Sequence, residues 1–280
     1  MQSILKKASN VLIRKRPLKY LVMRFLKSSR LCILFSIDRG DYRLRFHPSV
    51  LSGELWYEPE LRIDDEQFFK QYLRPGDSVI DVGANIGGLT LQSSVMVGQA
   101  GKVTAIEAHP RIFRYLVKNV DFNRATNVQL YNCALGNADG TVRFADGAMD
   151  DTNAITIGEQ GLQVPVYRLD SLPIETASIA LLKVDVEGFE IFVFEGAERA
   201  LQATKCVYFE SWEENFRRYG YSCKDLIEWL ERAGFSIYRL SESNCVERVR
   251  QDHSAQICEN LIAVRDIADF IERTKFRIRD

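Results

Sequence analysis

The sequence predicts an α/β fold in which a mostly parallel β-sheet is covered by helices on both faces. Short apolar stretches with the length of buried strands recur at residues 78–82, 102–106, 128–131, 179–186 and 206–209. Helical segments separate most of them, and two further strands are expected at 236–240 and 259–264. This alternation predicts parallel pairing, because parallel neighbours need a crossover connection that is usually a helix. Short, continuously apolar strands also fit a sheet that is buried on both sides.

Residues 1–30 precede the alternating region and are strongly basic. They carry nine lysines and arginines with no acidic residue before Asp38, so a chain of net charge −1 has −10 on its remainder. Apolar residues recur at helical spacing in 4–12 and in 18–26, with Pro17 between them, which predicts two short amphipathic helices. Such helices contact a membrane surface or an acidic partner, or they cap the main domain. We favour the cap, because most amphipathic helices face a core.

A β-hairpin is expected after these helices. Residues 31–37 and 42–46 alternate in polarity on either side of a polar turn that contains Gly40, as the two strands of a hairpin do. The helices and the hairpin together define an N-terminal extension, residues 1–50, ahead of a main domain at 51–280.

Within the main domain, two helices have clear start signals. Pro110 occupies a first-turn position, where its missing N–H costs nothing. Ser222 and Asp225 are spaced like a capping box, and Gly234 follows the last apolar position as a helix terminator. Residues 136–175 interrupt the alternation with several glycines, and we expect an irregular insertion there that carries a hairpin of 141–144 and 162–167.

Composition excludes several classes of protein. The 280 residues are 46% hydrophobic and 27% charged, with 37 basic and 38 acidic residues. This balance is typical of a globular domain and argues against a generic nucleic-acid binder. No apolar run approaches the ~20 residues that span a bilayer, and the run at 31–37 lies too far along the chain for a secretory signal.

The six cysteines are scattered and form no C-x-x-C pair. Zinc-ribbon and disulfide-framework interpretations therefore fail, and isolated thiols fit a reducing, cytoplasmic compartment. No metal is expected, because the histidines and cysteines lack ligand spacing, although an oxygen-only site stays open.

The first chemical motif is the segment from Val79 to Gly88, with the sequence Val-Ile-Asp-Val-Gly-Ala-Asn-Ile-Gly-Gly. An apolar strand leads into a glycine-rich turn and then a helix, whose N-terminus offers unpaired N–H groups to an anionic ligand. In the dinucleotide fingerprint the second glycine gives the pyrophosphate a bare backbone. Asn85 stands at that position here, so a ligand without a pyrophosphate, such as S-adenosyl-L-methionine, fits better.

The second motif is an acid at the end of the next strand. Glu107 follows the strand at 102–106 and lies twenty residues after Gly87. A carboxylate at this place can accept hydrogen bonds from both hydroxyls of a ribose. The turn and the acid together predict a cofactor that contains adenosine.

The third motif is a group of acids after two later strands. Asp185 and Glu187 follow a buried strand, and Glu210 ends the strand after it. In an open α/β sheet, ligands bind beyond the carboxyl ends of the strands. We therefore expect these three carboxylates in the same crevice as Asp81 and Glu107.

In combination these segments resemble the FkbM family of S-adenosylmethionine-dependent methyltransferases. The matching stretches are residues 57–60, 75–87, 107–110, 134–136, 164–172 and 183–190, which keep the order and spacing across roughly residues 54–240. The resemblance implies the Rossmann-like class I methyltransferase fold, with seven strands of which only the last is antiparallel. It also implies methylation of hydroxyl groups in polyketide tailoring and in sugar or glycan contexts.

The resemblance further implies roles for individual residues. The methionine part of the cofactor is expected to be held by Asp81, Gly83, Asn85 and Gly87, and the ribose by Glu107. The adenine is expected beside the residues that end the third strand, Asn132, Cys133 and Ala134. Asp185 would face the amino group of the cofactor or the acceptor.

We therefore predict an O-methyltransferase that acts on a small-molecule or glycan acceptor. The hydroxyl proton must be removed, and the candidate catalytic residues are Asp185, Glu187 and Glu210, with Glu187 ranked first as the base. His47 is an alternative base, whereas His109 is expected to cap the helix that Pro110 opens.

Two alternatives remain at the level of the sequence. One is a nicotinamide-dependent oxidoreductase on the same kind of sheet, which is disfavoured because Asn85 replaces the second glycine of the dinucleotide fingerprint. The other is a non-catalytic protein that binds S-adenosylmethionine, which would need no acid group after the later strands. The acceptor and the oligomeric state are not predicted.

Overall fold

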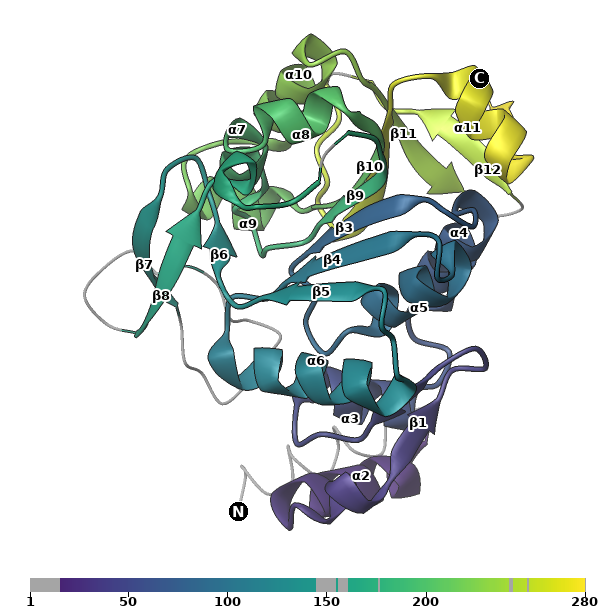
Figure 1. Ribbon diagram of the computed structural model, residues 1–280, viewed down its shortest axis with the longest axis vertical. Helices are drawn as coiled ribbons and strands as arrows, with labels where there is room; N and C mark the ends of the chain where they lie inside the picture. Colours follow the sequence, from purple (N-terminus) through teal and green to yellow (C-terminus); the bar gives the residue numbers. More distant parts are fainter. Residues whose placement is uncertain are drawn as a thin grey trace.

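A twisted nine-stranded sheet forms the centre of the molecule (Figure 1). The computed structural model describes residues 16–144, 155, 161–175, 177–241, 244–250 and 252–279. The strand order is β14-β12-β11-β13-β10-β9-β3-β4-β5. In chain order the strands are β3 (Ser78–Val82), β4 (Lys102–Ile106), β5 (Val128–Tyr131), β9 (Ile179–Val184), β10 (Thr204–Ser211), β11 (Ser236–Ser241), β12 (Cys245–Arg248), β13 (Glu259–Val264) and β14 (Arg277–Arg279).

The direction of the strands confirms the expected class I topology. The neighbours from β5 to β10 are all parallel, whereas β13 is antiparallel to both β10 and β11. Strand β11 therefore runs with the parallel set, so that six of the seven predicted strands run in one direction and β13 runs against them. A sheet of this kind collects the carboxyl ends of its central strands along one edge, where ligands bind.

The two outermost strands, β12 and β14, were not predicted. They extend the sheet beyond β11 and have only four and three residues. All three residues of β14 are exposed, so no burial pattern marks this strand in the sequence. Hydrophobic periodicity reveals a strand by its buried face, so it does not reveal an exposed edge strand such as β14.

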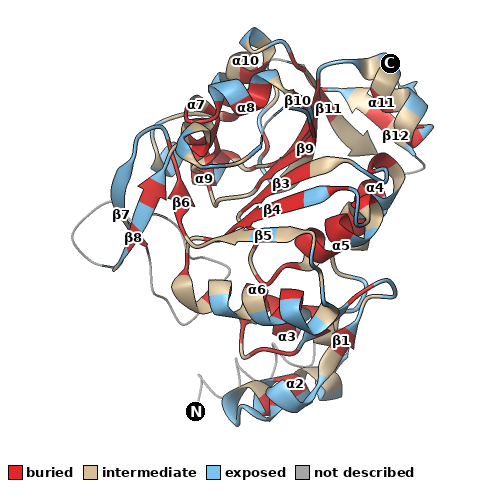
Figure 2. Ribbon diagram, in the orientation of Figure 1, coloured by how far each residue is buried: buried red, intermediate tan, exposed pale blue. Residues whose placement is uncertain are grey.

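Helices cover both faces of the sheet, as predicted. One face carries α4 (Ile63–Tyr72), α5 (Gly88–Val97) and α11 (Ile267–Thr274), and the other carries α7 (Glu190–Glu195), α8 (Glu198–Gln202) and α10 (Cys223–Arg232). Successive side chains of a strand point to opposite faces. Val79 accordingly packs in the cluster of the first set and Ile80 in that of the second. Figure 2 shows the resulting buried centre.

The N-terminal extension packs on the main domain rather than standing apart. It comprises α2 (Pro17–Ser28), the 3-10 helix η1 (Leu31–Leu34), β1 (Ser36–Asp38) and β2 (Arg43–Arg45), and α3 (Val50–Tyr57) follows it. Met23, Leu44 and Phe46 share one apolar cluster with Ile112 and Leu116 of α6 (Pro110–Asn123). The helix predicted over residues 4–12 lies outside the described residues.

The predicted hairpin of the extension is present but shorter than expected. Strands β1 and β2 pair antiparallel, whereas residues 31–34 form η1, so the strand predicted there was wrong. Arg30 adopts a left-handed backbone conformation with φ of 58°, and only Cys32 of the four residues in η1 is buried. A short apolar run does not distinguish strand from helix by its pattern alone.

The insertion holds the expected hairpin. Strands β7 (Gly140–Phe144) and β8 (Leu162–Tyr167) pair antiparallel, and β6 (Ala134–Leu135) adds to β8 as a third, parallel strand. A 3-10 turn, η3 (Leu169–Ser171), leads back toward β9. Most of the residues between β7 and β8 lie outside the described part of the chain.

The predicted helix caps are also confirmed. The His109 side chain accepts a hydrogen bond from the N–H of Arg111, and Pro110 opens α6. Ser222 and Asp225 form a full capping box at α10. A short helix, α9 (Glu213–Arg218), precedes α10. Within the described residues, the length and apolar character needed to cross a bilayer are not combined in any helix.

Candidate active site

A cleft opens at the carboxyl ends of β3, β4 and β9, at the edge of the sheet where the sequence predicted a site. Its walls come from the turn after β3, the ends of β4 and β5, the turn after β9 and the helix α3. The lining comprises Leu51, Glu54, Leu61, Arg62, Val82, Gly83, Asn85, Ile106, Glu107, Ala108, Ile112, Cys133, Ala134, Leu135, Phe144, Ile155, Asp185, Val186, Glu187 and Phe189. Seven of the eleven predicted cofactor and catalytic residues line the cleft: Gly83, Asn85, Glu107, Cys133, Ala134, Asp185 and Glu187.

The glycine-rich turn after β3 is tightly packed against the turn after β9. Gly83 has φ of +75°, and a Cβ at this position would lie 1.8 Å from the backbone oxygen of Asp185. Gly87 has φ of +92°, and its Cβ would lie 2.5 Å from Leu116. Only glycine fits both conditions, because L-residues rarely adopt positive φ and have a Cβ that needs space. The two turns therefore meet as one continuous wall.

Glu107 forms the floor of the cleft and links two of its walls. Its carboxylate accepts hydrogen bonds from the backbone N–H groups of Asn85 and His109, both at 2.9 Å. Burial raises the pKa of Glu107 to about 7, against the lowering effect of these two hydrogen bonds. The side chain of Asn132 donates to the backbone oxygens of Glu107 and Ala108, so Asn132 supports the floor from behind.

Lys183 is a buried cation that sequence reasoning did not single out. Its Nζ lies 3.2 Å from Asp81 Oδ1 and 3.5 Å from Asp185 Oδ2, and it donates to the backbone oxygens of Val82 and Gly83. Burial alone would lower the pKa of Lys183, but the two carboxylates raise it above its usual value. A lysine in an otherwise apolar strand was the available signal, since a buried charge needs partners.

Asp81 is fully buried below the glycine-rich turn. It accepts a hydrogen bond from the hydroxyl of Thr90 at 2.6 Å and pairs with Lys183. It lines a smaller cavity behind the cleft, together with Gly83 and Asn85. Four predicted site residues, Asp81, Gly87, Asn132 and Glu210, are absent from the lining of the main cleft.

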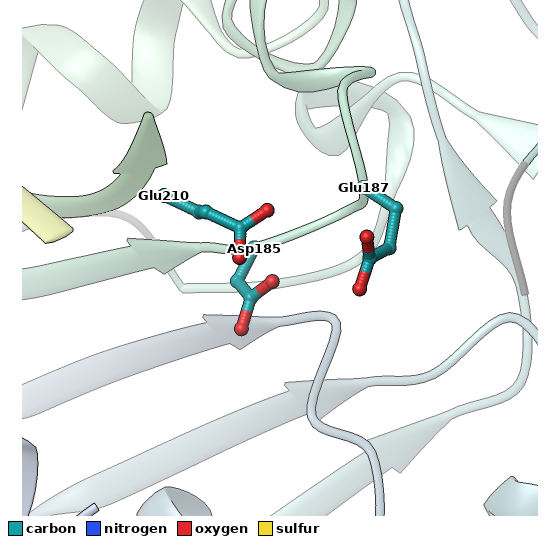
Figure 3. A group of neighbouring side chains, drawn as sticks. All are labelled: Asp185, Glu187 and Glu210. Carbon is teal, nitrogen blue, oxygen red and sulfur yellow. The ribbon is translucent and has the colours of Figure 1, made fainter. Parts of the chain in front are cut away.

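Three carboxylates from the later strands gather beside the cleft (Figure 3). One oxygen from each of Asp185, Glu187 and Glu210 lies within 4.8 Å of the others. We call this set the acid group. Asp185 and Glu210 project from neighbouring strand ends, and Glu187 comes from the turn after β9, where it has φ of 57°.

The acid group holds two carboxyls with raised pKa values. Burial, then Glu210 and Asp185, raise the pKa of Glu187 to about 8. Burial, then Asp185, raise the pKa of Glu210 to about 7. The side chain of Asn215 donates to Glu187 at 3.2 Å, and the thiol of Cys258 donates to Glu210 at 3.0 Å. Carboxyls poised near neutral pH in a cleft are suited to accept a proton.

The acid group could also hold a hard divalent cation. Carboxylate oxygens are the ligands that Mg²⁺ and Ca²⁺ prefer, and the three side chains are close enough to share an ion. The possible ligands in this set are carboxylates, and Cys258 contacts it only through its hydrogen bond to Glu210. The expected absence of a metal remains a prediction.

Arg62 is a second cation that the sequence motifs missed. It precedes α4 with φ of 62°, and its Nη1 lies 3.8 Å from Asp185 Oδ2 at the edge of the cleft. Nearby, Leu51 and Glu54 of α3 complete the same wall. These residues are far from the glycine-rich turn in the sequence, and only the neighbouring motif at 57–60 hinted that the segment belongs to the site.

Apolar side chains contribute a large part of the lining of the cleft. Ile106, Ile112, Cys133, Leu135 and Phe144 gather there. Apolar side chains beside a carboxylate suit the two ends of a nucleoside, since the base stacks on apolar groups and the ribose hydroxyls donate to the acid. Together with the open backbone at Gly83, the cleft fits adenosine with a short amino-acid tail.

Three further side chains with functional potential, among them the alternative base His47, lie outside the lining of the cleft. His47 is buried and stacks on Tyr115, outside the lining, and burial followed by Lys118 lowers its pKa to about 4. His253 pairs with Glu259, which begins β13 beside Ser211 of β10, and neither residue of this pair lines the cleft. Phe216 is buried in the core. Core packing therefore explains Phe216.

Comparison with known proteins identifies the family. The model of the methyltransferase FkbM domain matches residues 81–237, a stretch that contains the glycine-rich turn, Glu107 and the whole acid group. The chain belongs to the FkbM methyltransferase family. Membership confirms the predicted resemblance and the predicted cofactor, S-adenosyl-L-methionine. It favours this class over a nicotinamide-dependent oxidoreductase.

Individual relatives of this FkbM methyltransferase are distant. It is 25% identical over 177 residues to the hexuronic acid methyltransferase AglP of Haloferax volcanii, a match that covers 61% of this chain and 71% of the relative. It is 27% identical over 163 residues to the protein-L-isoaspartate O-methyltransferase of Caenorhabditis elegans, covering 56% and 71%. Among solved structures it is similar to methyltransferase FkbM from Methylobacillus flagellatus, with 16% identity, a TM-score of 0.43 and coverage of 77% and 55%.

Proposed function

We propose that this FkbM methyltransferase transfers the methyl group of S-adenosylmethionine to a hydroxyl oxygen of a sugar, glycan or polyketide-type acceptor. The observation that carries the proposal is the position of the acid group beside the cleft, where Glu187 and Glu210 have raised pKa values. An alcohol is a poor acid, so its methylation gains from a nearby group that removes the proton. A protein that only bound the cofactor would have no need of such a group.

The chain offers distinct places for the parts of the cofactor. Glu107 would accept hydrogen bonds from the ribose hydroxyls, and Ile106, Cys133 and Ala134 would flank the adenine. The turn with Gly83 and Asn85 would hold the methionine part, supported from behind by Asp81 and Gly87. Bound there, S-adenosylmethionine supplies an electrophilic methyl group.

The acid group would then act on the acceptor. Asp185 is tied to Lys183 and lies closest to the glycine-rich turn, which suits a binding or orienting role. Glu187 would remove the hydroxyl proton, with Glu210 as the second choice. The remaining rate acceleration would come from holding the acceptor oxygen in line with the methyl group, because bound, aligned reactants need no bimolecular encounter.

A second candidate acceptor is a carboxylate. The names of two relatives, a hexuronic acid methyltransferase and a protein-L-isoaspartate O-methyltransferase, support it. A carboxylate is already ionised near neutral pH and needs no base. Arg62 at the edge of the cleft could pair with its charge. The two candidates differ in whether Glu187 matters for turnover.

The proposal is tested by methyl transfer itself. The protein is incubated with radiolabelled S-adenosylmethionine and panels of neutral sugars, uronic acids, glycans and polyketide alcohols, and the labelled product is identified. Labelling of an alcohol that resists mild base supports the hydroxyl proposal, whereas a base-labile methyl ester supports the carboxylate candidate. Binding of the cofactor with no transfer to any class or to a cell extract contradicts both.

A further inference from the structure

The outer side of α2 and η1 presents an unusual concentration of exposed apolar side chains. Thirteen large hydrophobic residues of the described chain are exposed, and eight of them fall between residues 18 and 35. These eight are Leu18, Leu21, Val22, Phe25, Leu31, Ile33, Leu34 and Phe35, which we call the apolar patch. Figure 2 shows α2 at the rim of the molecule, with much of its surface exposed. Contiguous patches of this kind mark interaction surfaces.

The apolar patch is not the core-facing side of the helix. Met23 and Leu26 already make the contact with the main domain and are buried at 6% and 8% exposure. Leu18, with 79% exposure, Leu21, Val22 and Phe25, with 61% exposure, recur at the spacing of one helical face and point away from that core. An ordinary surface helix is polar on this side. Helix α2 therefore has a second apolar face that the domain does not use.

The charge of the same segment identifies the kind of partner. Lys19, Arg24, Lys27 and Arg30 lie within or beside α2, and no acidic residue occurs in the sequence until Asp38, whereas Arg16 at the start of the helix is paired with Glu60. Helices that combine an apolar face with lysines and arginines lie in the interface of an anionic bilayer, with the apolar side chains below the headgroups and the cations among them. A protein partner of similar size would need an acidic apolar surface of its own.

We propose that the apolar patch and the basic residues beside it dock this protein onto an anionic lipid bilayer as a peripheral contact. The sequence left this reading open and favoured a simple cap. The structure supports both, since one side of α2 caps the domain while the other faces outward. Binding is measured without turnover, so the proposal stands or falls separately from the proposed function.

Docking would place the cleft close to the bilayer. Helix α2 packs on α3, where a Cβ at Gly53 would lie 2.9 Å from Lys27 and 3.0 Å from Met23. Leu51 and Glu54 of the same helix line the cleft. If the proposed function holds, acceptors carried at a lipid surface are the ones that such a contact would favour.

The test is flotation of the full-length protein with lipid vesicles at low salt. We expect binding to vesicles of mixed phosphatidylcholine and phosphatidylglycerol to exceed binding to pure phosphatidylcholine by about tenfold or more. It should fall as salt is raised to about 0.5 M, where surface charges are screened. The double variant Leu18→Glu, Phe25→Glu should lose at least about tenfold in binding to the mixed vesicles, because it puts two charges in the apolar face.

Ile278→Glu is the matched control. It removes an exposed apolar side chain of 51% exposure from β14, next to the C-terminus, which Figure 1 marks at the opposite end of the molecule from α2, and the variant should bind like the parent. Circular dichroism melting should be the same for all variants, since each altered side chain is exposed.

Several outcomes would overturn the proposal. One is recovery of the parent protein at the bottom of the gradient with both vesicle types at low salt. Another is binding that the double variant retains in full, which would leave the apolar patch without a role. A dimer in sedimentation velocity that the double variant dissociates, with no flotation, would assign the patch to a second copy of this chain instead.

Discussion

The carboxylate of Glu107 accepts a hydrogen bond from the backbone N–H of Asn85 across 2.9 Å. The acid at the end of β4 thus holds the glycine-rich turn at the end of the neighbouring strand β3. The other carboxylate oxygen accepts from the N–H of His109 at the start of α6. One side chain therefore sets the relative position of two walls of the cleft, and its raised pKa records that it is buried.

Replacement of Glu107 by Ala should weaken S-adenosylmethionine binding by about tenfold or more, because hydrogen bonds to a charged group contribute about 1.5–3 kcal/mol each. Isothermal titration calorimetry measures the affinity. Glu198→Ala, which removes an exposed carboxylate from α8, serves as the control and should bind normally. An unchanged affinity for the Glu107 variant would remove Glu107 from the cofactor site.

The identity of the catalytic base is tested by replacing each candidate glutamate with glutamine. Glu187→Gln should lower turnover by roughly 10²–10⁴-fold while leaving the affinity for S-adenosylmethionine unchanged, because only proton removal is lost. Glu210→Gln is the comparison, and a larger effect there would reverse the ranking of the two residues. If both variants turn over at the parent rate, neither residue is the base, and catalysis then depends on the alignment of the acceptor with the methyl group.

The pH profile follows from the raised pKa of Glu187. At pH values below its pKa of about 8, the carboxyl of Glu187 is protonated and cannot accept a proton. Turnover with a hydroxyl acceptor should therefore increase about tenfold per pH unit between pH 6 and 8 and then level off. Glu187→Gln should flatten this rise. A profile that is flat for the parent protein would point to a carboxylate acceptor, which needs no base.

Lys183 is predicted to be essential for stability. Lys183→Met would leave Asp81 and Asp185 without their buried cation, and breaking a buried pair typically costs about 3–5 kcal/mol. Urea unfolding at neutral pH measures the change. Lys205→Met is the control on β10, where the ion pair with Asp269 is largely exposed, so the loss there should stay below about 1 kcal/mol. Equal losses of unfolding free energy for the two variants would show that the buried pairs of Lys183 stabilise the fold no more than an exposed ion pair does.

Removal of divalent cations should leave activity unchanged. We expect the same turnover after dialysis against EDTA, because the role proposed for Glu187 is that of a base. Loss of activity on EDTA treatment and its recovery on adding Mg²⁺ would instead make Asp185, Glu187 and Glu210 metal ligands.

The sequence by itself determined the alternation of the central strands and helices and the acids at the strand ends. These features follow from local periodicity and from one rule, that parallel strands present their carboxyl ends at a shared edge. Glu107, Asp185 and Glu187 were found in this way. The hairpin of β7 and β8 and the caps at His109 and Ser222 were readable for the same reason, since they depend on neighbouring residues.

Only the tertiary structure decided the contacts between distant segments. It paired Lys183 with Asp81, brought Arg62 to Asp185, and showed that α2 has one apolar face on the core and another outside. A periodic pattern states that a side chain is apolar, but not which of two faces another element will cover. Burial of a charge likewise depends on partners about a hundred residues away, which the chain meets only when the sheet is assembled.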